Sequence, residues 1–227
     1  MALKPKEQQN KFTSTPQPVL QVGGYPARVV GLIDLGVQKQ KPYLGMVKPP
    51  VHKIMLTYEL TDAFMVDEEG NELEDKPRWI SEILSFCPVS QDKAKSTQRY
   101  LAIDPDKKFE EDFTKLIDQV CTVNVVINKD ESSGKIYENV GNIVGMRERD
   151  KAKVPPLKNK PQLFLLDEPD MELWEKLPKF VKDKILEAKN LADTELGKEL
   201  GVESNPSSST KPTNQEGEEQ EGEDEVW

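Results

Sequence analysis

Apolar residues recur at every second position in parts of this chain, and this alternation limits the possible folds more than any other pattern in the sequence. In VHKIMLTYEL, residues 51–60, apolar and polar side chains alternate as in a β-strand with one buried face. The face expected to be buried holds Ile54, Leu56, Tyr58 and Leu60. The face expected to meet solvent holds Lys53, Met55, Thr57 and Glu59. This pattern favours an antiparallel sheet with one solvated face.

Four further segments have the composition of strands. Residues 21–36, QVGGYPARVVGLIDLG, predict a strand of roughly ten residues. Its apolar phase holds Ala27, Val29, Ile33 and Leu35, and its polar phase holds Arg28 and Asp34. The turn DEEGNE between AFMV and RWISEILSF predicts a hairpin. CTVNVVIN and IYENVGNIVGM predict two more strands, joined by the turn DESSGK.

A helical segment separates the third predicted strand from the fourth. Residues 93–102 can form one short helix that ends before Pro105, and a further turn can form around residues 109–117. Periodicity alone supports a small antiparallel β domain with a helix. The order strand, strand, strand, helix, strand, strand favours an OB-fold barrel. We therefore expect a mainly β protein whose five-stranded antiparallel OB-fold barrel covers residues 19–150, after a flexible arm at residues 1–18.

The composition changes after the predicted barrel, over residues 151–200. The first part is rich in lysine and proline and predicts an extended segment on the surface. MELWEKL and PKFVKDKILEAKNL predict two C-terminal helices. The second helix has an apolar stripe of Phe180, Val181, Ile185 and Leu186. This stripe could pack on the barrel or on another subunit, so a homodimer stays open.

The net charge of −10 is concentrated at the C-terminal end. Residues 203–227 carry eight acids and one lysine, a charge of −7, which leaves −3 for residues 1–202. Residues 201–227 therefore predict a disordered linker and acidic tail. No apolar run is long enough to span a bilayer, and the start of the chain lacks the apolar stretch of a secretory signal. With Cys87 and Cys121 as the only cysteines, a reducing cytoplasm is the expected location.

Motifs for chemistry are scarce. The sequence has no phosphate-binding glycine loop, zinc-protease, nucleophile-elbow or calcium-loop motif. The one histidine, His52, lies on the core-like phase of a predicted strand, where a structural role is the ordinary one. Each cysteine suits a small buried apolar position. We expect no enzymatic activity, no cofactor and no metal site.

Lysines gather in GVQKQKPYLGMVKPPVHK, residues 36–53, which contains no acid. In an OB-fold this loop joins the first two strands and borders the oligonucleotide groove. Its lysines could contact phosphates and its tyrosine could stack on a base, whereas the alternative is an ordinary solvated loop. A second cationic group lies around Trp79 and at the start of the predicted helix. The candidate DNA contacts are Lys39, Lys41, Tyr43, Lys48, Lys53, Arg78, Trp79, Lys93, Lys95, Arg99 and Tyr100.

Some of these assignments have alternatives. Tyr58, Trp79, Phe86 and Tyr100 could each face DNA or fill the core. Lys95 and Arg99 are four residues apart, so a helix would place them on one face. A third candidate group lies in the last hairpin turn and beyond it: Lys129, Lys135, Arg147 and Arg149.

The chain resembles the single-stranded DNA-binding proteins encoded by tailed bacteriophages. The resemblance lies in YPARVVGLIDLG, KPYLGMVKPP, HKIMLTYEL, DKAKSTQRYL and GKIYENVGNI, and it covers roughly residues 20–190. It implies an OB-fold that coats single strands without sequence preference during phage DNA replication, recombination and repair in the host cytoplasm. It also implies an acidic tail that competes with DNA for the basic groove and contacts phage or host replication proteins such as a DNA polymerase or helicase-primase.

The acidic tail ends in an aromatic residue, which a tail that serves solubility alone does not need. The residues expected to contact a partner are Glu223, Asp224, Glu225 and Trp227. Two rival functions stay open. The chain could be a replication scaffold that binds no DNA, or a DNA mimic whose acidic tail inhibits a DNA-binding enzyme.

Overall fold

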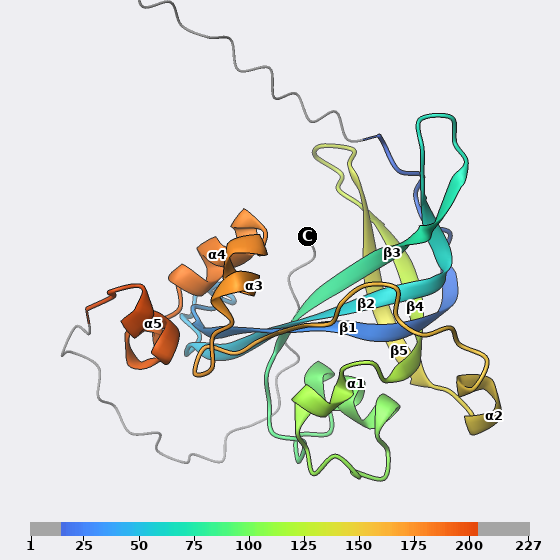
Figure 1. Cartoon of the computed structure of the whole chain (residues 1–227). Coiled ribbons are helices and arrows are strands. Elements are labelled where there is room, and N and C mark those ends of the chain that lie inside the picture. The colour runs from blue at the N-terminus through green and yellow to red at the C-terminus, as the bar shows by residue number, and fades with distance from the viewer. Residues whose placement is uncertain (1–14, 204–227) are drawn as a thin grey trace, which may run out of the picture.

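A central sheet organises the computed structural model, which describes residues 15–203. The strand order is β3-β2-β1-β4-β5, all neighbours in this path being antiparallel, and a short β6 pairs with β1 in parallel (Figure 1). The expectation of a mainly β protein is confirmed. The strands are β1 (Gly23–Gln38), β2 (Val51–Val66), β3 (Glu72–Ser85), β4 (Val120–Lys129), β5 (Ile136–Gly145) and β6 (Gln162–Phe164).

Two apolar cores lie on opposite faces of β1 and β2. The inner core, shared with β3, β4 and β5, includes Ala27, Val29, Leu32, Ile54, Leu56, Tyr58 and Leu60. The outer core, on the other face, includes Ile33, Leu35, Met55, Phe164, Trp174, Val181 and Ile185. The predicted buried face of residues 51–60 is therefore confirmed. The predicted solvent face is wrong, because Met55, Thr57 and Glu59 are each no more than 6% exposed.

Register shifts in β1 explain why one strand serves both cores. Its pairing with β2 is irregular between Val29 and Gly31 and again between Asp34 and Gly36. A β-bulge adds one residue and so reverses the face on which the following side chains lie. The single apolar phase predicted for this strand is therefore wrong: Val29 belongs to the inner core and Ile33 to the outer core.

The sheet is not closed into a barrel by a main-chain ladder between β3 and β5 within the described residues. Side chains bridge these strands instead. Arg78 of β3 lies 2.7 Å from Glu138 of β5. Arg99 bonds to Glu82 of β3 at 2.8 Å and donates to the carbonyl of Gly141 in β5 at 3.2 Å.

The predicted helix between the third and fourth strands is present. Helix α1 spans Lys95–Ile103, and the 3₁₀ helix η1 (Phe113–Leu116) follows it where a further turn was expected. Both contribute to the inner core, which places them on the face of the sheet opposite the C-terminal helices (Figure 1).

The C-terminal helices pack on the chain's own sheet, which settles a question that the sequence left open. The outer core lies between them and β1, β2 and β6 (Figure 1). Of the predicted apolar stripe, Val181 and Ile185 are fully buried, but Phe180 and Leu186 are 56% and 50% exposed. The helices that follow β5 are α2 (Glu148–Lys151), α3 (Met171–Lys176), α4 (Lys179–Leu186), the 3₁₀ helix η2 (Leu191–Asp193) and α5 (Glu195–Glu199).

The extended segment before α3 crosses the sheet rather than lying loosely on the surface. Its first part, here called the strap (residues 154–161), is held by two side chains of the sheet. Arg28 donates to the carbonyls of Val154 and Pro155, and Glu59 accepts from the backbone N–H of Lys158 at 2.7 Å. In β6, which follows the strap, Phe164 is buried, so the predicted surface position is wrong for this part.

Candidate nucleic-acid interface

The loop between β1 and β2, residues 39–50, forms a small hairpin of its own. Tyr43 and Met46 exchange two backbone hydrogen bonds of 2.9 Å. The two residues between them, Leu44 and Gly45, have φ values of +49° and +79°. Two successive positive φ values define the turn type whose twist matches a hairpin. This loop is called the basic hairpin below.

The tip of the basic hairpin is apolar and faces solvent. Leu44 and Val47 are 82% and 86% exposed, and Tyr43 is 42% exposed. The ammonium of Lys48 lies 4.7 Å from the centroid of the Tyr43 ring, a cation–π contact that orients the ring. The tip thus offers an aromatic face and aliphatic side chains beside positive charge.

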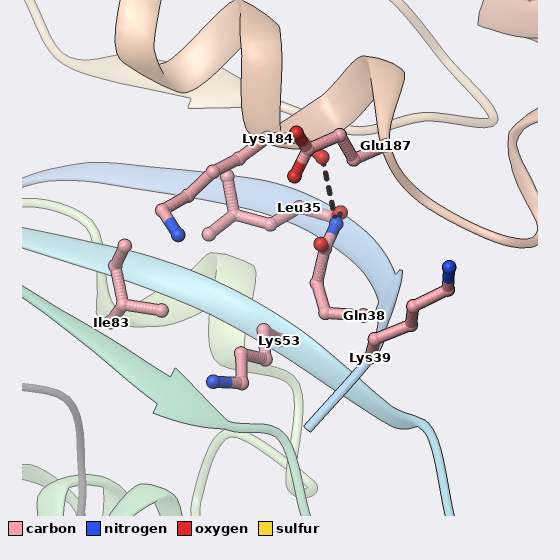
Figure 2. Close-up of a pocket in the computed structure, with 7 residues that line it drawn as sticks. All are labelled: Leu35, Gln38, Lys39, Lys53, Ile83, Lys184 and Glu187. Atoms are coloured by element: carbon pink, nitrogen blue, oxygen red, sulfur yellow. Dashed lines mark hydrogen bonds between the residues drawn. The ribbon is translucent and has the colours of Figure 1, made fainter. Parts of the chain in front are cut away.

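A pocket of about 560 Å³ opens beside the base of the basic hairpin. Its walls come from β1, β2 and β3 on one side and from α4 on the other (Figure 2). Lys39, Lys53 and Lys184 give it three cations against the single acid Glu187. This lysine pocket is lined by Leu35, Gln38, Lys39, Lys53, Ile83, Lys184 and Glu187.

Hydrogen bonds fix α4 against the end of β1 and so fix the shape of the lysine pocket. The side-chain amide of Gln38 donates to the carbonyl of Lys184 at 2.8 Å (Figure 2). The N–H of Lys189 donates to the carbonyl of Val37 at 2.8 Å, and the N–H of Val37 donates to the side chain of Asn190 at 2.7 Å. These hydrogen bonds join the two walls of the pocket directly.

The structure brings together five of the candidate DNA contacts. Lys39, Lys41, Tyr43 and Lys48 belong to the basic hairpin, and Lys53 and Lys39 line the lysine pocket. The sequence did not point to Lys184, because the apolar stripe of this helix indicates packing alone. A usable signal was present: Lys184 and Glu187 lie on a different helical row from the buried Val181 and Ile185.

Three candidates are corrected because the structure buries them. Tyr100 is 0% exposed and donates its hydroxyl to Asp104 at 2.9 Å. Arg99 and Arg78 are 2% and 8% exposed and form the ion pairs that bridge β3 and β5. Their guanidinium groups are satisfied within the protein, so none of the three presents a surface to DNA. Tyr58, 0% exposed, likewise fills the core.

The other candidates lie apart from the lysine pocket. Trp79 is 36% exposed, and its indole N–H donates to Glu59 at 3.1 Å beneath the strap. Phe86 is half-buried against the ring of Phe113, at 5.0 Å between centroids. Lys93 and Lys95 are exposed at the start of α1, across the sheet from α4, so Lys95 does not share a solvent face with Arg99.

The third candidate group is offset by acids. In the β4–β5 turn Asp130 lies between Lys129 and Lys135, and hydrogen bonds from Ser132 and Ser133 lower the pKa of Asp130 to about 2. Beyond β5, Arg147 and Arg149 both pair with Asp150, at 2.6 Å and 3.7 Å. Each of these cations therefore has an acid close to it in the sequence or in space.

A second, apolar pocket of about 250 Å³ lies on the inner-core side. His52 lines it, and its Nε2 lies 2.6 Å from Asp34.

The two cysteines are both partly or fully buried. Cys121 is fully buried, and burial raises the pKa of its thiol to about 12, which agrees with a structural role. Cys87 is half-buried.

Comparison with known proteins adds no family to this picture. No protein-family model matches the chain, and no curated protein matches it either.

Among residues 15–203, no helix has the length and apolar character that crossing a bilayer requires. In the same residues, no three side chains of the metal-binding types group as they would around an ion. The tail candidates Glu223, Asp224, Glu225 and Trp227 lie outside the described residues.

Proposed function

We propose that the chain is a single-stranded DNA-binding protein of OB-fold type. The strand order β3-β2-β1-β4-β5, with a helix between β3 and β4, supports this class. In such a fold β3 and β5 are the strands that meet when the barrel closes. Here Arg78 and Arg99 link these two strands through side chains, which supports a barrel that is closed at this seam without a ladder.

The basic hairpin together with the lysine pocket is the observation that carries the proposal. Four lysines and Tyr43 lie within residues 36–53, and no acid lies among them. A row of cations neutralises the phosphates of a nucleic acid, while an exposed ring and aliphatic tip contact base faces. Base faces are accessible only in a single strand, so the apolar tip favours single strands over a duplex.

The biological setting is part of the same proposal. A protein that coats single strands without sequence preference serves replication, recombination and repair, and for a phage-encoded chain these occur in the host cytoplasm. The acidic tail would resemble a single strand in charge density, cover the basic surface when DNA is absent, and contact replication proteins when DNA displaces it. Tethering gives such a tail a local concentration on the order of millimolar, so weak contacts suffice.

A binding titration tests the proposal and separates it from its rivals. Fluorescence anisotropy would be measured with a labelled oligo-dT of about 30 nucleotides and with a duplex of the same length. The full chain should bind the single strand more tightly than the duplex, and a chain ending at Gly201 should bind it more tightly still. Failure of both chains to bind at low salt would overturn the proposal and favour the scaffold or the DNA mimic.

A further inference from the structure

We propose that α4 forms the second wall of the DNA groove, with Phe180 stacking on a base and Lys184 contacting a backbone phosphate. This inference rests on the proposed function and adds two ligand-binding residues to it. It also assigns a role to the C-terminal helices beyond packing on the sheet.

The spacing of residues in α4 brings this wall together. Phe180, Lys184 and Glu187 follow one another at intervals of four and three residues, so they lie along one row of the helix. The two members of the row that follow Phe180 line the lysine pocket; these are Lys184 and Glu187 (Figure 2). Phe180 therefore extends that lining by one helical turn.

The exposure of Phe180 has no explanation in the packing of α4. The buried row of the helix already consists of Val181 and Ile185, both 0% exposed, while Phe180 is 56% exposed. An exposed phenyl ring one turn from a lysine, beside a pocket with three cations, has the two elements that single-strand binding uses. These are a stacking surface and a phosphate contact.

The rigid attachment of α4 makes the wall suited to a ligand. A Cβ added at Gly36 would lie 2.8 Å from the Cβ of Ala188 and 2.8 Å from the side-chain oxygen of Asn190. With the hydrogen bond from Gln38 to Lys184, this close packing sets the position of α4 relative to Lys39 and Lys53. A groove whose walls are fixed in advance loses little entropy on binding.

Glu187 gives the groove a direction. It is the one acid of the lysine pocket and lies at the end of the row opposite Phe180. A carboxylate repels phosphates, so the strand should leave the pocket past Lys184 toward Phe180 rather than past Glu187. Neutralising this acid should therefore strengthen binding, whereas neutralising Lys184 should weaken it.

Matched substitutions on α4 test the wall. Phe180→Ala should weaken binding of the full chain to oligo-dT by at least about fivefold. Leu186→Ala removes a similarly exposed apolar side chain from another row and should change binding less than twofold. Lys184→Gln should reduce the magnitude of the salt slope by about 0.7, and its control Lys179→Gln should change the slope less. Glu187→Gln should increase the affinity for oligo-dT.

An abasic oligonucleotide isolates the stacking contact. On a strand without bases the loss caused by Phe180→Ala should vanish, while the loss caused by Lys184→Gln should remain. Thermal unfolding of each variant verifies that these substitutions leave the fold intact. If the unmodified chain binds oligo-dT but Phe180→Ala and Lys184→Gln equal their controls, the α4 wall is overturned and the proposed function stands. If the unmodified chain binds no oligo-dT, the proposed function itself fails.

Discussion

A single carboxylate holds the turn that follows α1. Asp104 is 4% exposed, and it accepts hydrogen bonds from the N–H of Lys108 at 2.9 Å and of Phe109 at 2.7 Å, and from the hydroxyl of Tyr100. Burial alone would raise the pKa of Asp104, but these donors outweigh it and hold the pKa below its ordinary value. Burial and the bond to Asp104 also raise the pKa of Tyr100 to about 12, so the tyrosine stays a donor at neutral pH.

Asp104→Asn should destabilise the protein by about 1–3 kcal/mol at pH 7, because the amide group turns a donor toward an N–H group. The folded-state pKa of Asp104 is depressed, so its contribution is present above the unfolded value near 4 and is lost as pH falls through the folded value. Urea denaturation at pH 7 and at pH 3 measures both free energies of unfolding. The gap between the two proteins should shrink at the lower pH; an unchanged gap would contradict this role.

The fate of individual residues shows what sequence can and cannot predict about the site. The sequence could group Lys39, Lys41, Tyr43, Lys48 and Lys53 as candidates because they lie within residues 36–53, which contain no acid. The buried cations were not recognisable. The sequence does not show whether an arginine binds a phosphate or a carboxylate of the same protein. The partner acids are distant in the chain: Glu82 lies 17 residues before Arg99, and Glu138 lies 60 residues after Arg78.

At the scale of elements, the bulged end of β1 joins the sheet to α4. Gly36 has a φ of +69° and packs against Ala188 and Asn190, so both its conformation and its lack of a side chain are required. The lysine pocket depends on this contact, because one of its walls is β1 and the other is α4.

Gly36→Ala should therefore cost about 2–4 kcal/mol of stability, from a left-handed conformation and from overpacking together. It should also weaken binding of oligo-dT by shifting α4. Gly45→Ala is the control, since Gly45 has a φ of +79° but no atom within 4 Å of the added Cβ. Urea denaturation should show the control losing only about 1–2 kcal/mol. Equal losses in the two variants would contradict the packing argument.

The elements themselves were predictable to different degrees. Alternation indicated β2 and part of β1, whereas strand-like composition and turn residues indicated β3, β4 and β5 and the hairpin between β2 and β3. A helical segment ending before Pro105 indicated α1. The bulges of β1 were not visible, because the apolar residues continue through them and only their faces change. The burial of Glu59 was not visible either: its donors are Trp79 on the neighbouring strand and the strap, about a hundred residues further along the chain.

At the scale of the whole molecule, one buried ion pair links both edges of the sheet. Arg99 of α1 bonds to Glu82 in β3 and to the carbonyl of Gly141 in β5, while Glu82 also accepts from Tyr58 at 2.9 Å. The link between β3 and β5 thus depends on charge and on the position of α1 rather than on a strand ladder.

Arg99→Met should destabilise the protein by about 3–5 kcal/mol, because it leaves the carboxylate of Glu82 buried without its cation. Adding Glu82→Gln should recover part of this loss, since the amide can still accept from Tyr58 and carries no charge. Urea denaturation of the two single variants and the double variant gives the coupling energy. Additive losses would show that the pair does not act as a unit.

The central claim is that the basic hairpin and the lysine pocket bind the phosphates of single-stranded DNA. The direct measurement is the dependence of oligo-dT affinity on salt concentration. Four to six phosphate contacts predict a slope of about −3 to −4 in a plot of log K against log salt. Replacing Lys39, Lys41, Lys48 and Lys53 with Gln should make this slope shallower by about 2–3.

The control removes the same charge elsewhere, by replacing Lys107, Lys108, Lys115 and Lys153 with Gln. Both variants have the same net charge, so a difference between them reports position alone. The predicted result is a slope near its original value in the control and a much shallower slope in the first variant. The same slope in both variants, or no binding by the unmodified chain at low salt, would contradict the claim.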